Sequence, residues 1–309
     1  MSAMLRPEPA SQVLGPGRTC PTSYRYSPRV FDREPAIVAD AVYVVGGLYG
    51  NVEALEAVAE LAAREPGAVL VFNGDFHWFD VDPADFAAVE RAVARHPALR
   101  GNVETELAGE DDGAGCGCAY PADVSDGVVS RSNEILERLR ATARTQPDAR
   151  ARLGGLPMHA VARVGEARVG IVHGDAVSLA GWGFARDRLD EPAHHRWVES
   201  MLEAGNVDVF ASTHTCLPAL RRFTRGVVAN NGAAGMPNFP GRRAGLATRI
   251  GVEPLARGRA VERIAARGAH VELVEVAYDH DRWLRRFLAA WPEGSPAHTS
   301  YFTRIAEGA

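Results

Sequence analysis

Residues 44–51 read VVGGLYGN, an apolar strand that runs into a glycine-rich turn and then into the start of a predicted helix. Four further apolar segments end in short polar sequences in the same way. They are AVLVFNGD at 68–75, LRGNVE at 99–104, VGIVHGD at 169–175 and VDVFASTHTC at 207–216. Loops at the carboxyl ends of strands in an α/β sheet can aim polar side chains at one point while the strands stay rigid. The five blocks therefore predict an α/β protein with one shared polar site.

The order and spacing of these blocks resemble those of the calcineurin-like metallophosphoesterases. The last four blocks are similar to the family's GD, GN, HGD and GHTH blocks, and NNGAAG at 230–235 resembles its closing Asn-Pro-Gly-Ser block. The resemblance covers roughly residues 42–240. It implies the family's four-layer α/β/β/α sandwich and a metal-dependent reaction on a phosphate ester.

The resemblance implies two sets of metal ligands, and only one set is complete in this chain. At the first metal the family has an Asp and two His residues, where this chain has Gly47, Tyr49 and Cys216. The implied ligands of the second metal are all present. They are Asp75, Asn102, His173 and His214. We therefore expect one divalent transition metal, Mn, Zn or Fe, and no second metal.

The loss of one metal position changes the implied chemistry. Two cations about 3.5 to 4 Å apart hold both the attacking and the leaving oxygen in phosphoryl transfer. One cation can still lower the pKa of a bound water, so protein groups must supply the second contact. In addition, Val103 stands where the family often has a His that can act as an acid. Several small phosphodiesterases of the family also lack that His, so hydrolysis is still compatible with this sequence.

Tyr49 and Cys216, which replace lost ligands, are predicted catalytic residues with two interpretations each. Cys216 is either a thiolate ligand of zinc or iron and a nucleophile, or an inert buried thiol. Tyr49 either contacts a substrate oxygen or fills the vacated metal position. Ligation by Tyr49 is disfavoured because a phenol with a pKa of about 10 ionises reluctantly.

The stretch FHWFD at 76–80 follows the predicted ligand Asp75. Its three aromatic residues predict a pocket wall for an apolar or flat group. His77 is predicted as a catalytic residue because His titrates near neutral pH, with metal ligation or a structural hydrogen bond as alternatives.

Asn51 and Arg131 are the predicted substrate-binding residues. Asn51 ends the first block, beside the predicted site. Arg131 lies near the start of a predicted helix over 128–144, where an anion is favoured. An arginine solvated at a helix end would fit the same pattern.

The chain has four cysteines, which are Cys20, Cys116, Cys118 and Cys216. The N-terminal region lacks the apolar core of a signal peptide, so we expect a cytoplasmic protein with reduced thiols and no structural disulfide. Cys116 and Cys118 form a CxC pair in a glycine-rich loop, with the wrong spacing for a zinc knuckle. Three interpretations of the pair stay open: thiolates for the vacated half of the pocket, a redox pair, or turn residues with no shared role.

Composition agrees with a single large α/β protein. The chain has 309 residues, 46% of them hydrophobic, which is enough for a sizeable core. The net charge of −5 comes from 34 basic and 39 acidic residues, and no basic tract with interleaved aromatics predicts a nucleic-acid partner. No apolar run is long enough to span a membrane. We therefore expect a small anionic molecule as the partner.

Three segments are predicted along the chain. Residues 1–40 form an irregular arm, 41–280 form the metallophosphoesterase-like domain with a helical insertion at about 105–157, and 281–309 form a C-terminal helix and a docked tail. The leading functional hypothesis is a metal-dependent hydrolase of a small phosphate ester or related anion. The alternatives are a mononuclear zinc or iron enzyme of altered chemistry that uses Cys216, and a non-catalytic binding or scaffold protein on the same fold.

Overall fold

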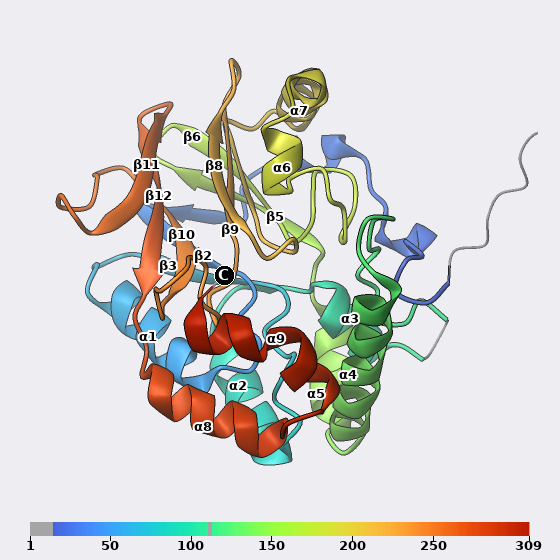
Figure 1. Ribbon diagram of the computed structural model, residues 1–309. Coiled ribbons are helices and arrows are strands. Elements are labelled where there is room, and N and C mark those ends of the chain that lie inside the picture. Colours follow the sequence, from blue (N-terminus) through green and yellow to red (C-terminus); the bar gives the residue numbers. More distant parts are fainter. Residues whose placement is uncertain (1–14, 111–112, 309) are drawn as a thin grey trace, which may run out of the picture.

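Two six-stranded sheets pack face to face in the computed structural model, which describes residues 15–110 and 113–308 (Figure 1). The first sheet has the strand order β11–β12–β10–β2–β3–β4, and the second sheet has the order β1–β5–β6–β7–β9–β8. Helices cover the outer faces of both sheets. The architecture is therefore the four-layer α/β/β/α sandwich that the sequence predicted.

Each sheet contains a run of three neighbouring parallel strands. The first sheet contains β2 (Ala41–Val45), β3 (Val69–Asn73), β4 (Ala98–Leu99), β10 (Gly245–Gly251), β11 (Ala260–Ala266) and β12 (Ala269–Val276). The second sheet contains β1 (Ile37–Ala39), β5 (His159–Val164), β6 (Ala167–Val172), β7 (Val209–Ser212), β8 (Pro218–Arg222) and β9 (Val227–Asn231). Strands β2, β3 and β4 run parallel to one another, as do β6, β7 and β9. The loops that follow these strands carry the polar blocks of the sequence.

Most helices lie on the outer face of the first sheet. This group comprises α1 (Val52–Ala63), α2 (Pro83–Val93), α3 (Asn102–Ala108), α4 (Asp126–Arg144), α5 (Pro147–Gly155), α8 (His280–Ala290) and α9 (Pro296–Glu307). The second sheet is covered by α6 (Arg186–Leu189), α7 (Pro192–Gly205) and the short 3₁₀ helix η2 (Pro28–Phe31), and another 3₁₀ helix, η1, spans Thr22–Tyr24. None of the helices in the described part of the chain combines the length and apolar character that a bilayer crossing requires.

Three apolar layers hold the four structural layers together. Between the sheets, side chains such as Val44 and Val71 of the first sheet meet Ile171 and Ala211 of the second, all of them fully or almost fully buried. A second layer lies between the first sheet and its helices, and a third lies between the second sheet and α7. The strands at the centre are apolar on both faces because both faces are covered.

A capping residue and a proline stand at the start of helix α2. The Asp82 side chain accepts hydrogen bonds from the backbone N–H groups of Ala84 and Asp85, and Pro83 occupies the first position of α2. Asp82 therefore caps the start of α2, and proline is favoured at the first helical position. Helix α4 begins at Asp126, two residues before the predicted start.

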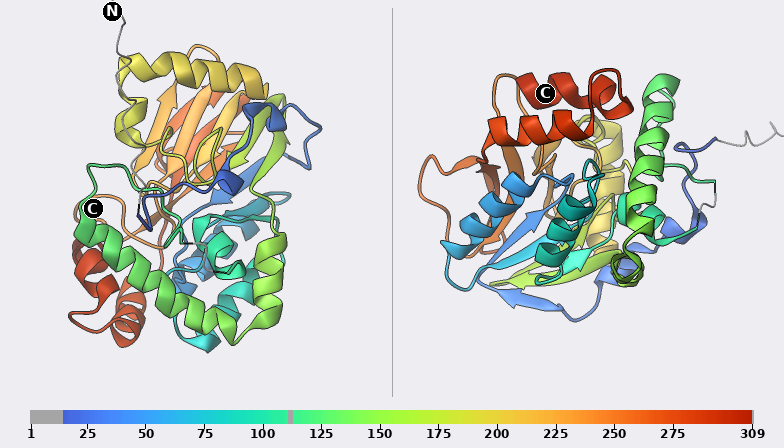
Figure 2. Two further views of the ribbon diagram at one scale, coloured as in Figure 1. Left: turned by 90° about the vertical axis from the view of Figure 1, so that its right-hand side faces the viewer. Right: turned by 90° about the horizontal axis from the view of Figure 1, so that it is seen from below.

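The two ends of the described chain are more regular than the sequence indicated. Within the predicted irregular arm, residues 37–39 form β1, which pairs in parallel with β5 because Ile37 is buried against the second sheet. Residues 1–14 of that arm lie outside the described residues. At the other end, where only a docked tail was predicted, residues 296–307 form α9, which packs against α4 and α8 (Figure 2).

A buried network of charges joins α1 to the first sheet. Arg249 of β10 bonds to Glu272 of β12 and to Glu65 just beyond α1, and Tyr43 of β2 donates a hydrogen bond of 2.7 Å to Glu65. Arg263 of β11 also bonds to Glu272. The Arg249 and Glu272 side chains are almost fully buried, so the charge of each group is stabilised by the opposite charge of the other.

Replacing Arg249 with Met is expected to destabilise the protein by about 3 to 5 kcal/mol, because it removes one of the two arginines that bond to the buried Glu272 carboxylate. Urea unfolding monitored by circular dichroism measures this change. The control is Arg225→Met, which breaks an exposed ion pair with Glu203 and should cost no more than about 1 kcal/mol. Equal stabilities of the two variants would contradict the structural role given to the network.

Candidate metal centre and adjoining cavity

Four polar side chains from separate loops meet where strands of the two sheets end. Asp75 follows β3, Asn102 begins α3, His173 follows β6 and His214 follows β7. Potential ligand atoms of Asp75, His173 and His214 all lie within 4.8 Å of one another. All four side chains are almost fully buried. The structure thus brings together the four residues that the sequence predicted as metal ligands.

The point of convergence is Nε2 of His173. It lies 3.2 Å from Asn102 Oδ1, 3.2 Å from His214 Nδ1 and 3.4 Å from Asp75 Oδ2. Imidazole nitrogen together with carboxylate and amide oxygen is a donor set that suits divalent transition metals.

Three main-chain carbonyls fix the direction in which these side chains face. His173 Nδ1 lies 2.9 Å from Asn73 O, and His214 Nε2 lies 3.1 Å from Cys118 O. The amide nitrogen of Asn102 donates to Cys116 O at 2.9 Å. A carbonyl oxygen can only accept, so each of these nitrogens carries the proton. The opposite atoms, namely His173 Nε2, His214 Nδ1 and Asn102 Oδ1, therefore turn lone pairs toward one another and toward the Asp75 carboxylate.

Such a meeting of electron-pair acceptors fits a cation between them. Burial by itself would lower the pKa of His173, but the neighbouring Asp75 carboxylate outweighs burial and raises that pKa above its ordinary value. Burial and the positive charge of a protonated His173 lower the pKa of His214 to about 3. The site therefore attracts one positive charge at His173 Nε2, where a metal ion would compete with a proton.

Glu104 supports the ligand loops, although the sequence analysis did not select it. Its buried carboxylate accepts hydrogen bonds from the backbone N–H groups of Asp75 at 2.7 Å, Phe76 at 3.0 Å and Gly101 at 2.8 Å. Burial and the Asp75 charge raise the pKa of Glu104 to about 7. The signal for this role is the spacing of Gly101 and Glu104, in which a Glu at the third helical position reaches back to the residue before the helix.

Two glycines allow the loops to approach this closely. Gly74 has a φ of +76°, and a Cβ atom there would lie 2.6 Å from His173 Nδ1. A Cβ atom on Gly101 would collide with Asp75 Oδ1 and lie 2.8 Å from His173 Cε1. The glycines of the GD and GN blocks are therefore required by the packing around His173.

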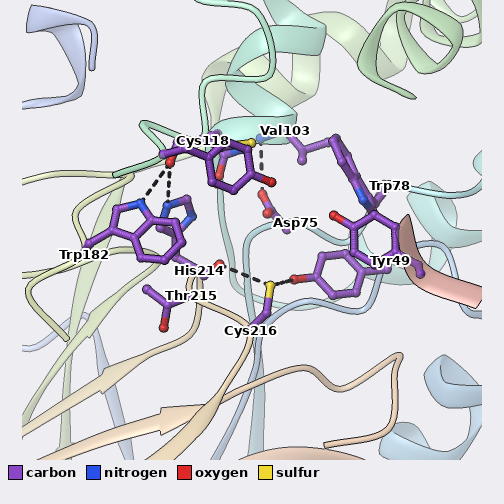
Figure 3. Close-up of a pocket in the computed structure, with 12 residues that line it drawn as sticks. Tyr49, Asp75, Trp78, Val103, Cys118, Trp182, His214, Thr215 and Cys216 are labelled. Carbon is purple, nitrogen blue, oxygen red and sulfur yellow. Dashed lines mark hydrogen bonds between the residues drawn. The ribbon is translucent and has the colours of Figure 1, made fainter. Parts of the chain in front are cut away.

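Tyr49 and Cys216, which replace two of the ligands that the resemblance implies for the first metal, contact each other. The Tyr49 hydroxyl lies 2.8 Å from Cys216 Sγ, and a Cβ atom on Gly47 would lie 3.0 Å from the Tyr49 hydroxyl oxygen (Figure 3). Burial raises the pKa of Tyr49 well above its ordinary value and also raises the pKa of Cys216. These shifts favour the neutral form of both groups, which agrees with the interpretation of Cys216 as a buried thiol.

An aromatic cavity of about 180 Å³ opens beside the four convergent residues. Asp75, Asn102 and His214 form part of its wall. Its aromatic walls are Tyr49, Trp78, Tyr120, Trp182 and Tyr301 (Figure 3). No Lys or Arg is among its lining residues in the described part of the chain. The cavity is therefore suited to a flat or apolar group held against a metal site.

Arg304 of α9 contacts the main chain of Cys216, a residue of the cavity wall. Its guanidinium donates to the main-chain oxygen of Cys216 at 2.7 Å and to that of Pro237 at 2.9 Å. It also contacts Asn238 Oδ1 at 3.5 Å. Arg304 therefore holds the main chain of Cys216 and is not among the residues that line the cavity.

His77 is not brought to the cavity. Its ring is fully buried between carboxylates, with Nδ1 2.6 Å from Asp80 and Nε2 3.2 Å from Glu90, and it stacks on Phe86 at a centroid distance of 3.8 Å. Burial opposes protonation, but the two carboxylates outweigh it and raise the pKa of His77 to about 9. This geometry contradicts the predicted catalytic role. Of the aromatic residues around His77 in the sequence, only Trp78 lines the cavity.

Asn51 and Arg131 are also absent from the cavity lining. The Asn51 side chain caps α1 by accepting from the Ala54 N–H, and it donates to Gly235 O at 2.9 Å. Arg131 donates to the Ser300 hydroxyl at 2.7 Å and so links α4 to α9. Their observed contacts are structural, in contrast to the predicted substrate contacts.

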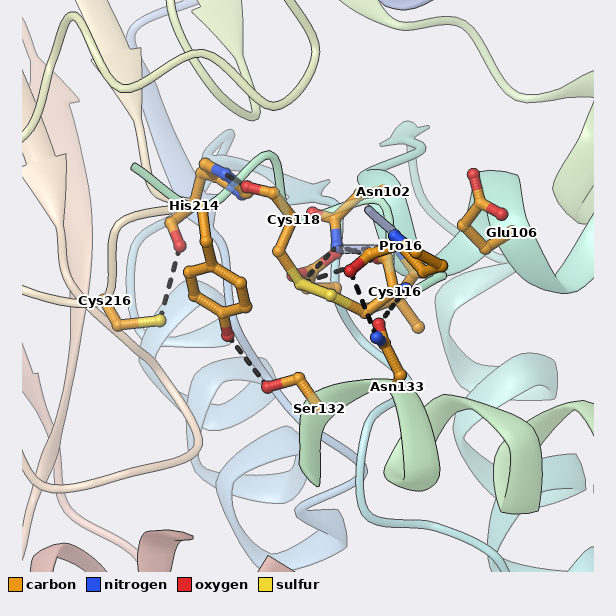
Figure 4. The surroundings of a disulfide bond; sticks show 12 residues. Pro16, Asn102, Glu106, Cys116, Cys118, Ser132, Asn133, His214 and Cys216 are labelled. Atoms are coloured by element: carbon orange, nitrogen blue, oxygen red, sulfur yellow. Dashed lines mark hydrogen bonds between the residues drawn. A yellow bond between two sulfur atoms is a disulfide. The ribbon is translucent and has the colours of Figure 1, made fainter. Parts of the chain in front are cut away.

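Cys116 and Cys118 form a disulfide bond, whereas the sequence analysis expected reduced thiols and no structural disulfide (Figure 4). Gly117 between them has a φ of +63°, which lets the chain turn tightly enough to bring the two sulfurs together. Cys118 lines the cavity, while Cys20 lies elsewhere, 3.4 Å from the Ser178 hydroxyl. The four cysteines therefore do not all lie at the cavity.

Solved structures with the same architecture have low sequence identity to this chain. A hypothetical protein from Pyrococcus horikoshii OT3 matches with a TM-score of 0.60 at 18% identity, over 88% of this chain and 99% of that chain. A metallophosphoesterase from Sphaerobacter thermophilus matches with a TM-score of 0.56 at 16% identity, over 87% and 100% of the two chains. No protein-family model and no curated protein matches the chain. The chain therefore has the metallophosphoesterase fold.

If His77 is structural, His77→Leu should destabilise the protein by about 3 to 5 kcal/mol and leave its metal content unchanged. The physical reason is that Asp80 would lose its buried positive partner. Thermal unfolding and elemental analysis of the purified variant measure the two quantities. His195→Leu, at an exposed position of α7, is the control. Loss of metal without loss of stability would show that His77 serves the site after all.

Proposed function

We propose that the protein is a hydrolase that uses one divalent transition metal to cleave a small phosphate ester or related anion. Asp75, Asn102, His173 and His214 would hold the metal. The observation that carries the proposal is the convergence of their lone pairs around His173 Nε2, because main-chain carbonyls already bind the protons on the far side of three of these groups. A fold shared with a metallophosphoesterase supports the same reaction class.

A bound divalent cation supplies a Lewis acid that can activate water and polarise a phosphoryl oxygen. The two imidazoles favour Mn, Zn or Fe over Mg and Ca, which prefer sites made only of oxygen. Asp75 brings the single negative charge of the ligand set, and its Oδ1 is held by the Val103 N–H at 3.2 Å. The ligands are thus oriented before any metal or substrate binds.

Neutral hydrogen-bonding groups would take over the contact made by a second metal in the family. The Tyr49 hydroxyl and the Cys216 thiol both line the cavity, and their raised pKa values keep them protonated. The Tyr49 hydroxyl can therefore donate to an oxygen of the substrate without releasing its proton. A neutral donor stabilises developing negative charge less than a metal ion does, so we expect a slower enzyme than a two-metal phosphoesterase.

The walls of the cavity indicate what else the substrate carries. Trp78, Trp182 and Tyr301 present ring surfaces next to the metal position, and no cationic side chain lines the cavity in the described structure. A phosphate with several unshielded charges would be poorly compensated there, whereas an ester with one flat apolar group would bury that group against the rings. An aryl ester is therefore the appropriate first substrate to test.

Metal analysis tests the first half of the proposal. Protein purified with added Mn²⁺ or Zn²⁺ is expected to hold about one equivalent of metal per chain. His173→Ala should weaken metal binding by at least about 100-fold, since removing a direct ligand costs more than removing its supporting partner. His195→Ala on the exposed face of α7 should bind like the unmodified protein. Equal metal contents of the two variants would contradict the proposed centre.

Hydrolysis of aryl phosphate esters by the Mn²⁺-loaded protein tests the second half. Tyr49→Phe is expected to lower kcat by about 10- to 100-fold, because it removes a hydrogen-bond donor from the reacting phosphate, while the metal content stays the same. Unchanged kcat would show that Tyr49 only fills space. Stoichiometric metal without turnover of any ester would instead favour the non-catalytic binding or scaffold protein.

A further inference from the structure

Residues 115–119, which we call the CxC loop, contact the candidate metal centre through main-chain atoms. Cys116 O accepts from the Asn102 amide at 2.9 Å, and Cys118 O accepts from His214 Nε2 at 3.1 Å. Two of the three carbonyls that orient the proposed ligands therefore belong to the two residues joined by the disulfide (Figure 4). The orientation of Asn102 and of His214 depends on where these two carbonyls lie.

The loop has little regular structure to hold it in this shape. It contains no helix or strand, and Gly115, Gly117 and Ala119 all have positive φ values of 66°, 63° and 49°. Its other anchors are hydrogen bonds, such as the 2.9 Å bond from Cys116 N–H to Asn133 Oδ1 and the 3.1 Å bond from the Trp182 indole N–H to Cys118 O. The disulfide is the one covalent constraint within the described part of the loop.

Breaking the disulfide would remove the covalent constraint between the two residues that carry these carbonyls. Two thiol groups cannot stay at bonding distance, so the sulfurs must separate, and only one residue lies between them. The Cys116 side chain is fully buried, and the cavity lies on the side of Cys118. The separation is therefore easiest if Cys118 turns toward the cavity, and its carbonyl also binds His214 and the Trp182 indole N–H.

We propose that the Cys116–Cys118 disulfide is a redox switch that controls metal retention. The closed disulfide holds Asn102 and His214 in the orientation that binds the metal, and reduction of the disulfide releases that orientation and weakens metal binding. The proposal rests on the proposed metal centre and adds a regulatory input to it. Cys116 and Cys118 act in it as positioning residues, through their carbonyls.

A dithiol is the proposed reductant, and it opens the Cys116–Cys118 disulfide in two exchange steps. A thiolate of the dithiol attacks Cys118 Sγ, which faces the cavity, and the Cys116–Cys118 bond breaks as Cys116 leaves as a thiolate and takes up a proton. The second thiol of the reductant then displaces Cys118, which also becomes a thiol. Two electrons and two protons pass from the dithiol to the cysteine pair, and the dithiol becomes a cyclic disulfide.

The test compares Mn²⁺ binding by the full chain with the disulfide closed and open. Mn²⁺ is the probe because thiols bind it weakly, so free cysteines do not disturb the titration. Mass spectrometry after alkylation establishes the state of the pair. We expect the Kd for Mn²⁺ to rise by about 10- to 100-fold after reduction, as for loss of other groups that orient ligands, and to return on reoxidation.

Variants separate the switch from a general effect of the reductant. Cys116→Ser/Cys118→Ser should bind Mn²⁺ as weakly as the reduced protein and should not respond to reductant. Cys20→Ser, which removes a thiol outside the cavity, should respond like the unmodified chain. If the double variant does not fold, reduction and reoxidation of the unmodified protein still provide the comparison.

The outcomes distinguish this inference from the proposed function. Equal or tighter Mn²⁺ binding after reduction would overturn the switch and leave the metal centre in place. The absence of the disulfide from protein prepared under oxidising conditions would also overturn it. No Mn²⁺ binding in either state would overturn the metal centre itself, and the switch with it.

Discussion

Four electron-pair acceptors meet at one buried place in the protein, and this arrangement requires a positive charge among them. His173 Nε2 lies within 3.4 Å of an amide oxygen, a second imidazole nitrogen and a carboxylate oxygen, and carbonyls on the far side prevent the amide and the imidazoles from turning around. A proton on His173 can meet the requirement, and a divalent cation meets it with more contacts. Because Gly74 and Gly101 lack a Cβ atom, their loops can approach His173 and Asp75 closely enough to bring these groups together.

Tyr49 and Cys216 line the cavity beside this centre and contact each other through the phenol hydroxyl and the thiol. Burial raises the pKa of both groups, which favours their neutral forms and makes this part of the wall compatible with an apolar ligand. Trp78 and Tyr301 line the same cavity, and no Lys or Arg is among its lining residues in the described structure. A space lined by rings and without cations favours an apolar group over a charged one.

The sequence predicted the fold well because each polar block directly follows an apolar strand, and strand order then determines which blocks meet. The same reasoning failed for His77, which also follows a strand. Its ring direction is decided by Glu90 on α2 and by Asp80, and such tertiary partners leave no periodic pattern. Arg131 shows a similar limit, since the face of α4 that meets α9 is set by packing of the C-terminal segment.

The CxC loop lies in the insertion between α3 and α4 and supports the candidate metal centre without supplying a ligand side chain. Side chains of Asn102 and His214 point inward from elements of the sandwich, but their far atoms must bind something, and the insertion provides main-chain carbonyls for both. A carbonyl position depends on backbone conformation, and here the backbone is closed by a disulfide. The proposed switch links metal affinity at the centre to the redox state of the loop through these two hydrogen bonds, each of which is sensitive to small shifts of its acceptor.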